Sequence, residues 1–259
     1  MKELIAKYGI LIVAVLALAQ PWLLAIWRKF FRKGKIDIFP SGTIEAGYSA
    51  FGPTIGLSGT LRCTNQNLFV TSINLEITKQ KDSSKHLFDW TFFRSQKLTS
   101  KGQEAEFELP YSFMLSTSQP KRYNISFVDT NTRQEMQKII QKVRQAWTDL
   151  ISPEIQTGIP LTAEIISTKY HNEFSKSKTH VDAYTQLDRL CYWEPGQYSI
   201  TLKVYTSRPN QPFEERWKFN LEEEQIKAIR LNVVKILQDI CMVPSYGQYN
   251  FAYPIYEEA

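Results

Sequence analysis

A long apolar segment near the N-terminus constrains this chain more than any other feature of its sequence. Residues 8–27 contain no charged side chain and read YGILIVAVLALAQPWLLAIW. As an α-helix they would extend roughly 30 Å, about the thickness of the hydrocarbon core of a bilayer. Only Gln20 and Pro21 disfavour such a helix, and spanning helices tolerate a proline. The sequence therefore predicts one transmembrane helix over residues 8–27, preceded by a short tail, residues 1–7.

Two alternatives for this segment remain open. The triplet Ala-Leu-Ala at residues 17–19 is similar to the small-residue end of a cleavable signal peptide. Apolar sequence continues beyond that triplet and then meets basic residues, which favours a retained helix. A buried core helix is the other alternative.

Basic side chains follow the apolar segment directly and predict its orientation. The cluster lies in a juxtamembrane segment, residues 28–41, and consists of Arg28, Lys29, Arg32, Lys33 and Lys35. Basic flanks favour the cytoplasmic side, so we expect a single-pass membrane protein whose body lies in the cytoplasm. Anionic lipid headgroups of the bilayer are the expected partners of the cluster, and a plain topology determinant is the alternative.

The same basic residues account for the whole positive charge of the chain. The chain carries 31 Lys and Arg against 26 Asp and Glu, but seven of the bases and one acid precede residue 36. The remainder holds 24 bases and 25 acids and is close to neutral. A body without a basic excess does not favour nucleic acid as a partner.

The cysteines point to no cofactor or disulfide framework. Cys63, Cys191 and Cys241 are far apart, odd in number and contain no C-x-x-C pair. Cys63 and Cys241 lie in apolar stretches, where a free cysteine packs as a small hydrophobic residue. We therefore predict no metal and no other cofactor.

Most of the body alternates between apolar and polar residues, which is typical of half-buried strands. Ile73, Leu75 and Ile77 share one face of such a segment, and the polar turn 81–85 follows it. Residues 68–93 therefore predict a long hairpin. Many alternating strands joined by turns predict antiparallel sheets packed as a β-sandwich.

Two amphipathic helices interrupt the predicted strands. Thr132 with Glu135, and Asn220 with Glu223, have the spacing of a capping box at a helix start. Each pair precedes apolar residues at helical spacing, so each helix should dock one face on a sheet. The predicted fold is mainly β, an α+β sandwich with two added helices after the transmembrane helix.

The predicted body has two β-rich halves, residues 42–152 and 153–243, and each half ends in one of these helices. An aromatic C-terminal tail, residues 244–259, follows them. Its aromatic residues are Tyr246, Tyr249, Phe251, Tyr253 and Tyr256. These rings either pack back on the sheet or form a docking segment that a partner protein binds.

Several segments resemble an arrestin-like or immunoglobulin-like sandwich. They are Gly56-Leu-Ser-Gly-Thr-Leu-Arg62, Phe69-Val-Thr-Ser-Ile-Asn-Leu75, Phe107-Glu-Leu-Pro-Tyr-Ser-Phe113 and Trp193-Glu-Pro-Gly-Gln-Tyr198. The inserted helices depart from that pattern. The resemblance implies binding through exposed edges and loops, and it identifies no catalytic residue.

No residue pattern typical of catalysis stands out, so an enzyme is the less favoured reading. The leading hypothesis is a non-enzymatic, membrane-anchored protein that presents a protein-binding surface as an adaptor, sensor or assembly component. One alternative is a membrane-anchored enzyme of unrecognised type with a site near His171, His180 and Asp182. A second alternative is an extracytoplasmic envelope or adhesion module.

Overall fold

The computed structural model of this 259-residue chain describes residues 18–22, 33–99, 102–156, 162, 165–243 and 249–258. Of the predicted transmembrane segment, only residues 18–22 fall within these ranges, and they form a short helical turn. Within the described ranges, no helix combines the length and the apolar character needed to span a bilayer. This finding contradicts the predicted transmembrane helix, and with it the single-pass membrane topology and the cytoplasmic localisation.

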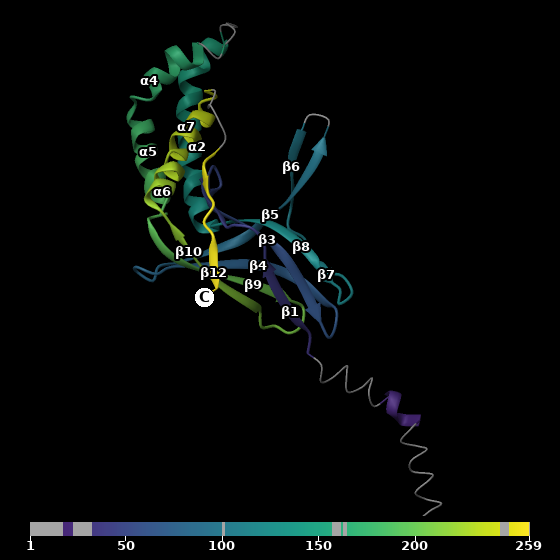
Figure 1. The fold of residues 1–259 in the computed structure, drawn as a ribbon. Coiled ribbons are helices and arrows are strands. Elements are labelled where there is room, and N and C mark those ends of the chain that lie inside the picture. Colours follow the sequence, from purple (N-terminus) through teal and green to yellow (C-terminus); the bar gives the residue numbers. More distant parts are fainter. Residues whose placement is uncertain are drawn as a thin grey trace, which may run out of the picture.

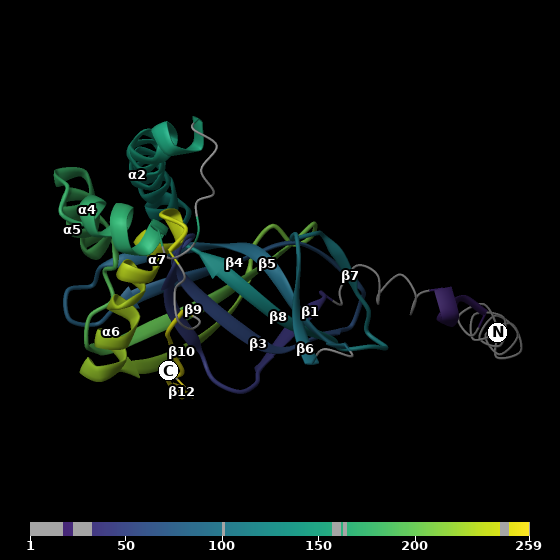
Figure 2. The ribbon, with the colours of Figure 1, turned by 90° about the horizontal axis from the view of Figure 1, so that it is seen from above.

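The described strands form one continuous antiparallel sheet that curls strongly around its own core (Figures 1 and 2). The strands are β1 Lys35–Pro40, β2 Glu45–Ser49, β3 Gly52–Thr64, β4 Leu68–Lys79, β5 Lys85–Thr99, β6 Gly102–Glu108, β7 Phe113–Leu115, β8 Lys121–Val128, β9 Gly196–Thr206, β10 Phe213–Leu221, β11 Phe251–Ala252 and β12 Tyr256–Glu258. Their order is β11-β2-β3-β8-β5-β4-β9-β10-β12, with β1 on β3, β6 on β5 and β7 on β4. The predicted long hairpin is β4 with β5.

The predicted sandwich of two sheets is wrong. β4, from the first predicted half, pairs with β9, from the second, between Val70 and Lys79. This pairing joins the strands of both halves into one sheet. A strongly curled sheet covers much of its own apolar face, so no second sheet has to pack against it.

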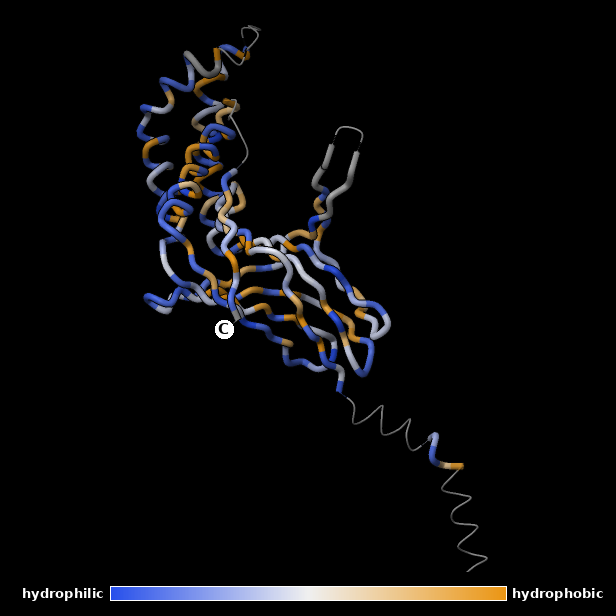
Figure 3. Tube along the Cα trace, viewed as in Figure 1, coloured by the Kyte–Doolittle hydropathy of each residue, from blue (hydrophilic) through white to orange (hydrophobic). Residues whose placement is uncertain are grey.

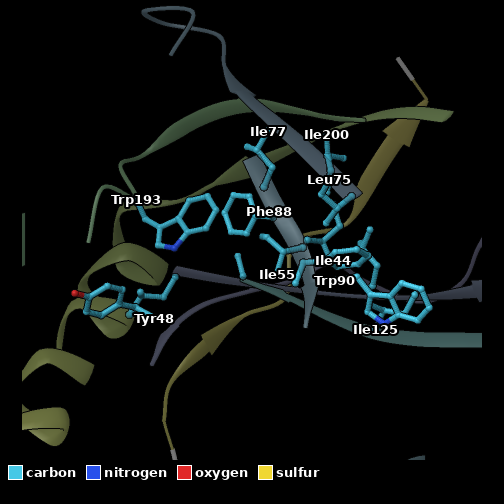
Figure 4. Close-up of a cluster of buried hydrophobic side chains, with 14 of the residues drawn as sticks. Ile44, Tyr48, Ile55, Leu75, Ile77, Phe88, Trp90, Ile125, Trp193 and Ile200 are labelled. Atoms are coloured by element: carbon cyan, nitrogen blue, oxygen red, sulfur yellow. The ribbon is translucent and has the colours of Figure 1, made fainter. Parts of the chain in front are cut away.

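The inner face of the curl carries the alternating apolar residues that the sequence indicated. Apolar and polar residues alternate along these strands (Figure 3), and Ile73, Leu75 and Ile77 are all at most 1% exposed. Figure 4 shows Phe88 beside Trp193 in this core, with their ring centroids 6.1 Å apart. Burying each such side chain stabilises the fold by roughly 1.5–3 kcal/mol.

The helices gather over one end of the sheet (Figures 1 and 2). They are α2 Thr130–Gln156, the π-helical turn η1 Ile166–His171, α4 Asn172–Phe174, α5 Lys178–Leu190, α6 Glu223–Arg230 and α7 Asn232–Ile240. α2 is long, but only one stripe of it is buried, so it is amphipathic rather than apolar all round. The two predicted helices correspond to α2 and to the pair α6 and α7, whereas α5 was not predicted.

Both predicted helix starts differ from the observed ones. The Asp129 carboxylate, and not Thr132, caps α2, because it accepts a hydrogen bond from the Thr132 backbone N–H at 3.1 Å. Glu222, and not Asn220, forms a capping box with Gln225 at the start of α6. A carboxylate satisfies the free N–H groups of a first helical turn as well as the predicted hydroxyl or amide does.

The C-terminal tail pairs with strands at both ends of the sheet order. β11 pairs with β2, and β12 pairs with β10. Between them, the Pro254 carbonyl accepts a hydrogen bond from the Ile44 N–H at 3.2 Å. The described part of the tail therefore packs back on the sheet, which was the first of the two expected arrangements.

Candidate functional site

Small residues share the outer face of the sheet where β2, β3 and β8 lie side by side. The register places Gly47 opposite Thr54 and Gly56 opposite Ser126. Directly opposed residues of paired strands point to the same face. These four positions therefore form a floor with little side-chain volume above it.

Aromatic side chains surround this floor. Phe92 of β5 makes edge-to-face contacts with Phe51 of the β2–β3 turn and with Phe107 of β6, at centroid distances of 5.7 and 5.9 Å. Tyr249 and Phe251 of the tail line the same hollow. The small-residue floor and the aromatic walls together enclose a hollow with a volume of about 550 Å³. We call this hollow the aromatic groove.

Two of the wall residues are unusually exposed for phenylalanine. Phe51 is 42% exposed and Phe107 is 59% exposed. A cluster of exposed aromatic rings at the edge of a concave surface is typical of a binding site rather than of a surface shaped by folding alone. The aromatic groove is therefore the strongest candidate site among the described residues.

Arg94 of β5 forms the charged end of the groove. Its Nη1 donates to the Glu45 carboxylate at 2.6 Å, and its Nε donates to the Asn124 side-chain oxygen at 3.2 Å. The guanidinium lies over Gly56, where a Cβ would overlap it. The glycine thus makes room for the arginine, and the two acceptors fix its orientation.

Arg133, in the first turn of α2, lies at the rim. Its guanidinium is 5.2 Å from the centroid of the Phe51 ring, within the range of a cation–π contact. No Asp or Glu of the described residues lies within ion-pair distance of it. Arg133 therefore adds a positive charge to the rim that no described carboxylate balances.

Phe251 shows how the floor receives an aromatic ring. Its ring lies directly over Gly47, its cross-strand partner, where a Cβ would overlap the ring carbons. Beside it, the Thr54 hydroxyl is buried and has no hydrogen-bond partner. A glycine in a strand thus allows a close approach from the outer face, here by an aromatic side chain of the same chain.

The predicted surface residues lie away from this groove or outside the described residues. Arg28, Lys29 and Arg32 of the basic cluster, and Tyr246 of the tail, fall outside them. Lys33 is described just before β1, and Lys35 pairs with Asp37 at 2.8 Å. The structure does not test the predicted contact of this cluster with lipid headgroups, which stays a prediction.

The other predicted tail residues lie in different environments. The Tyr249 hydroxyl donates to Asp239 at 2.6 Å, and Tyr256 packs against Trp217 at a centroid distance of 6.2 Å. Tyr253 is 56% exposed. Of the four predicted tail residues that the structure describes, Tyr249 and Phe251 line the aromatic groove.

The structure brings His171 and His180 together, but without Asp182. The two imidazole centroids lie 6.2 Å apart, the His180 ring also packs against Phe174, and burial lowers the pKa of both histidines. Asp182 lines a separate small hollow beside Lys142. No hydrogen bond joins Asp182 to either imidazole, so the carboxylate orients neither ring.

A polar cluster that the sequence did not predict surrounds Asp129 and includes His86. Its carboxylate accepts hydrogen bonds from Thr132 and from the Tyr192 hydroxyl, and the His86 ring stacks on Tyr192 at 3.7 Å. Burial raises the pKa of Asp129, but contacts with His86, Thr132 and Tyr192 hold it below its usual value. This cluster joins the start of α2 to the sheet.

Thiol and metal chemistry find no support in the described residues. Cys63, Cys191 and Cys241 are free and buried, and burial raises the pKa of the Cys191 and Cys241 thiols to about 12. Thiols with such a pKa stay protonated and unreactive. In the same ranges, no three His, Cys, Asp or Glu side chains gather in a way that could hold a metal ion.

Comparisons with known proteins identify no family. No family model matches this chain, and no curated protein matches it. Ten chains of solved structures match, among them the crystal structure of Spo0M, a sporulation control protein from Bacillus subtilis. That superposition has a TM-score of 0.25 and 7% identity, and covers 78% of this chain and 56% of Spo0M. This chain thus spans little more than half the length of Spo0M.

Proposed function

We propose that this chain is a protein-binding module, an adaptor or assembly component, whose aromatic groove receives an apolar segment of a partner protein. The observation that carries the proposal is the combination of a small-residue floor with exposed aromatic walls. The groove volume of about 550 Å³ lies within the range of about 300–1,000 Å³ for ligand sites. Aromatic side chains are also the residues that dominate binding energy at protein interfaces.

The chemistry of the lining favours binding over catalysis. Among the described residues that line the groove there is no histidine and no cysteine. Its carboxylate, Glu45, already pairs with Arg94. Without a base beside them, the hydroxyls of Thr54 and Ser126 are ordinary alcohols rather than activated nucleophiles.

The β5–β6 arm offers the partner a main-chain contact as well. Figure 1 shows the arm rising from the sheet on the same side as the helices. Within the described residues, β6 pairs only with β5, so its outer edge is open. An extended segment could add to this edge as a further strand beside Phe107. The open edge therefore supports an extended partner segment over a compact one.

A peptide selection tests the proposal. A phage library of random extended peptides is panned against the wild-type chain, and each enriched peptide is then tested against Ser126→Ile. Isoleucine is compatible with a strand, and its side chain fills the space above the small-residue floor. We therefore expect groove-binding peptides to lose at least about tenfold in affinity. The matched control is Ser199→Ile, on the outer face of β9 and outside the groove.

The two variants separate the outcomes. Enriched peptides that bind Ser199→Ile normally and Ser126→Ile weakly support the proposal. A library that yields no peptide with this difference contradicts it. Circular dichroism and thermal melting of both variants verify that each retains the fold.

A further inference from the structure

The charges around the aromatic groove favour one kind of partner segment. Glu45 and Arg94 neutralise each other inside the groove. Arg133 at the rim then leaves one positive charge without a described carboxylate to balance it. An acidic residue on the partner would supply the missing opposite charge.

The floor indicates which apolar residue the partner presents. The tail already places an aromatic ring over a small floor residue, Phe251 over Gly47. Ser126, another small floor residue, remains partly exposed within the groove. Phe51 and Phe92, in edge-to-face contact with each other, line the groove around it. A second aromatic ring there would find further edge-to-face partners.

Resting on the proposed function, we infer that the partner is an extended segment with an aromatic residue close to an acidic one. The ring lies over Ser126 among the aromatic walls. The carboxylate pairs with the guanidinium of Arg133, which the Phe51 ring already holds at the rim. The ring supplies the apolar contact, and the carboxylate selects acidic over basic segments.

Two synthetic octapeptides test this inference by fluorescence anisotropy. Both carry fluorescein and two phenylalanines at the same positions, and the residues beside the phenylalanines are aspartate in one peptide and lysine in the other. Because opposite charges attract and like charges repel at the rim, we expect the acidic peptide to bind about tenfold more tightly than the basic one.

Charge reversal at the rim gives the decisive contrast. Arg133→Glu should abolish or invert the preference for the acidic peptide, and Arg133→Gln should reduce it. Glutamate in the first turn of a helix suits the helix dipole, so the variant should fold. Arg144→Glu, an exposed position farther along α2, is the matched control and should keep the wild-type preference.

The failures of the two proposals are distinguishable. Equal binding of both peptides, or a preference unchanged in Arg133→Glu, overturns the acidic partner while leaving the protein-binding groove intact. Failure of both octapeptides, when the selection has yielded groove-dependent peptides, also overturns this inference alone. A free Phe-Asp dipeptide that binds as tightly as the acidic octapeptide overturns the extended segment in favour of a small-molecule site.

Discussion

The two faces of the same strands, β2, β3 and β8, carry opposite kinds of residue. The inner face presents Tyr48, Ile55 and Phe127, each of which is fully buried. Neighbouring positions on the outer face present small residues, among them Gly47 and Ser126. Successive side chains of each strand point to opposite faces, so the two faces share one backbone and differ in the size of their side chains. Large side chains on the inner face stabilise the core. Small side chains on the outer face leave the space that forms the aromatic groove.

The largest expected effect on stability comes from a substitution on the inner face. Phe127→Ala removes a fully buried ring, and we expect it to lower the free energy of unfolding by about 3–5 kcal/mol. Leu87→Ala, on a strand position that is 60% exposed, should change it by less than about 0.5 kcal/mol. Urea unfolding of both variants measures the difference, and equal losses would contradict the assignment of the faces.

A smaller effect is expected at the floor where the tail docks. Gly47→Ala places a methyl group into the Phe251 ring, so we expect a loss of about 1–3 kcal/mol and faster proteolysis of the tail. In a double-mutant cycle, Gly47→Ala should cost less when Phe251 is already alanine. Additive losses would show that the ring does not depend on the glycine.

The next prediction concerns the Asp129 carboxylate, which caps the start of α2 close to Arg133. Asp129→Asn weakens the contacts that fix the start of α2, near Arg133, and should cost about 1–2 kcal/mol at neutral pH. The pKa of Asp129 is lowered by folding, so its stabilisation is complete above the unfolded pKa and is lost as the pH falls below about 4.

Denaturant unfolding of wild type and Asp129→Asn across this acid range checks the prediction. The difference between the two proteins should shrink as the pH falls. A difference that stays constant down to the lowest pH at which both fold would contradict a stabilising role for the charged carboxylate.

The smallest expected effect on stability belongs to the groove itself. Ser126→Ile should change the free energy of unfolding by no more than about 0.5 kcal/mol, because the position is on the outer face. Ser199→Ile provides the comparison on another strand. A loss of several kcal/mol in Ser126→Ile alone would show that the floor is part of the core and not a binding surface.

The sequence predicted what depends on local periodicity and missed what depends on pairing between distant strands. Alternation at Ile73, Leu75 and Ile77 correctly identified a strand and its buried face. Nothing in that alternation states that β4 pairs with β9, and this pairing separates one curled sheet from a sandwich. The apolar segment 8–27 was interpreted as a transmembrane helix from its length and its lack of charged residues, and within the described ranges no helix could span a bilayer.

The candidate site gave only a faint signal in the sequence. Gly47 and Gly56 interrupt strand patterns, and a glycine in a strand often marks a close approach by another group. That Phe251 covers one of them and Arg94 the other follows from strand register and from the return of the tail.

Amide chemical-shift mapping tests the central claim, that the outer face binds an apolar segment in the aromatic groove. The nitrogen-labelled chain is titrated with the most enriched peptide from the selection. We expect the largest shifts at Thr54, Gly56 and Ser126, and their loss in Ser126→Ile. Shifts confined to the outer face of β9 and β10, or shifts that persist unchanged in Ser126→Ile, would contradict it.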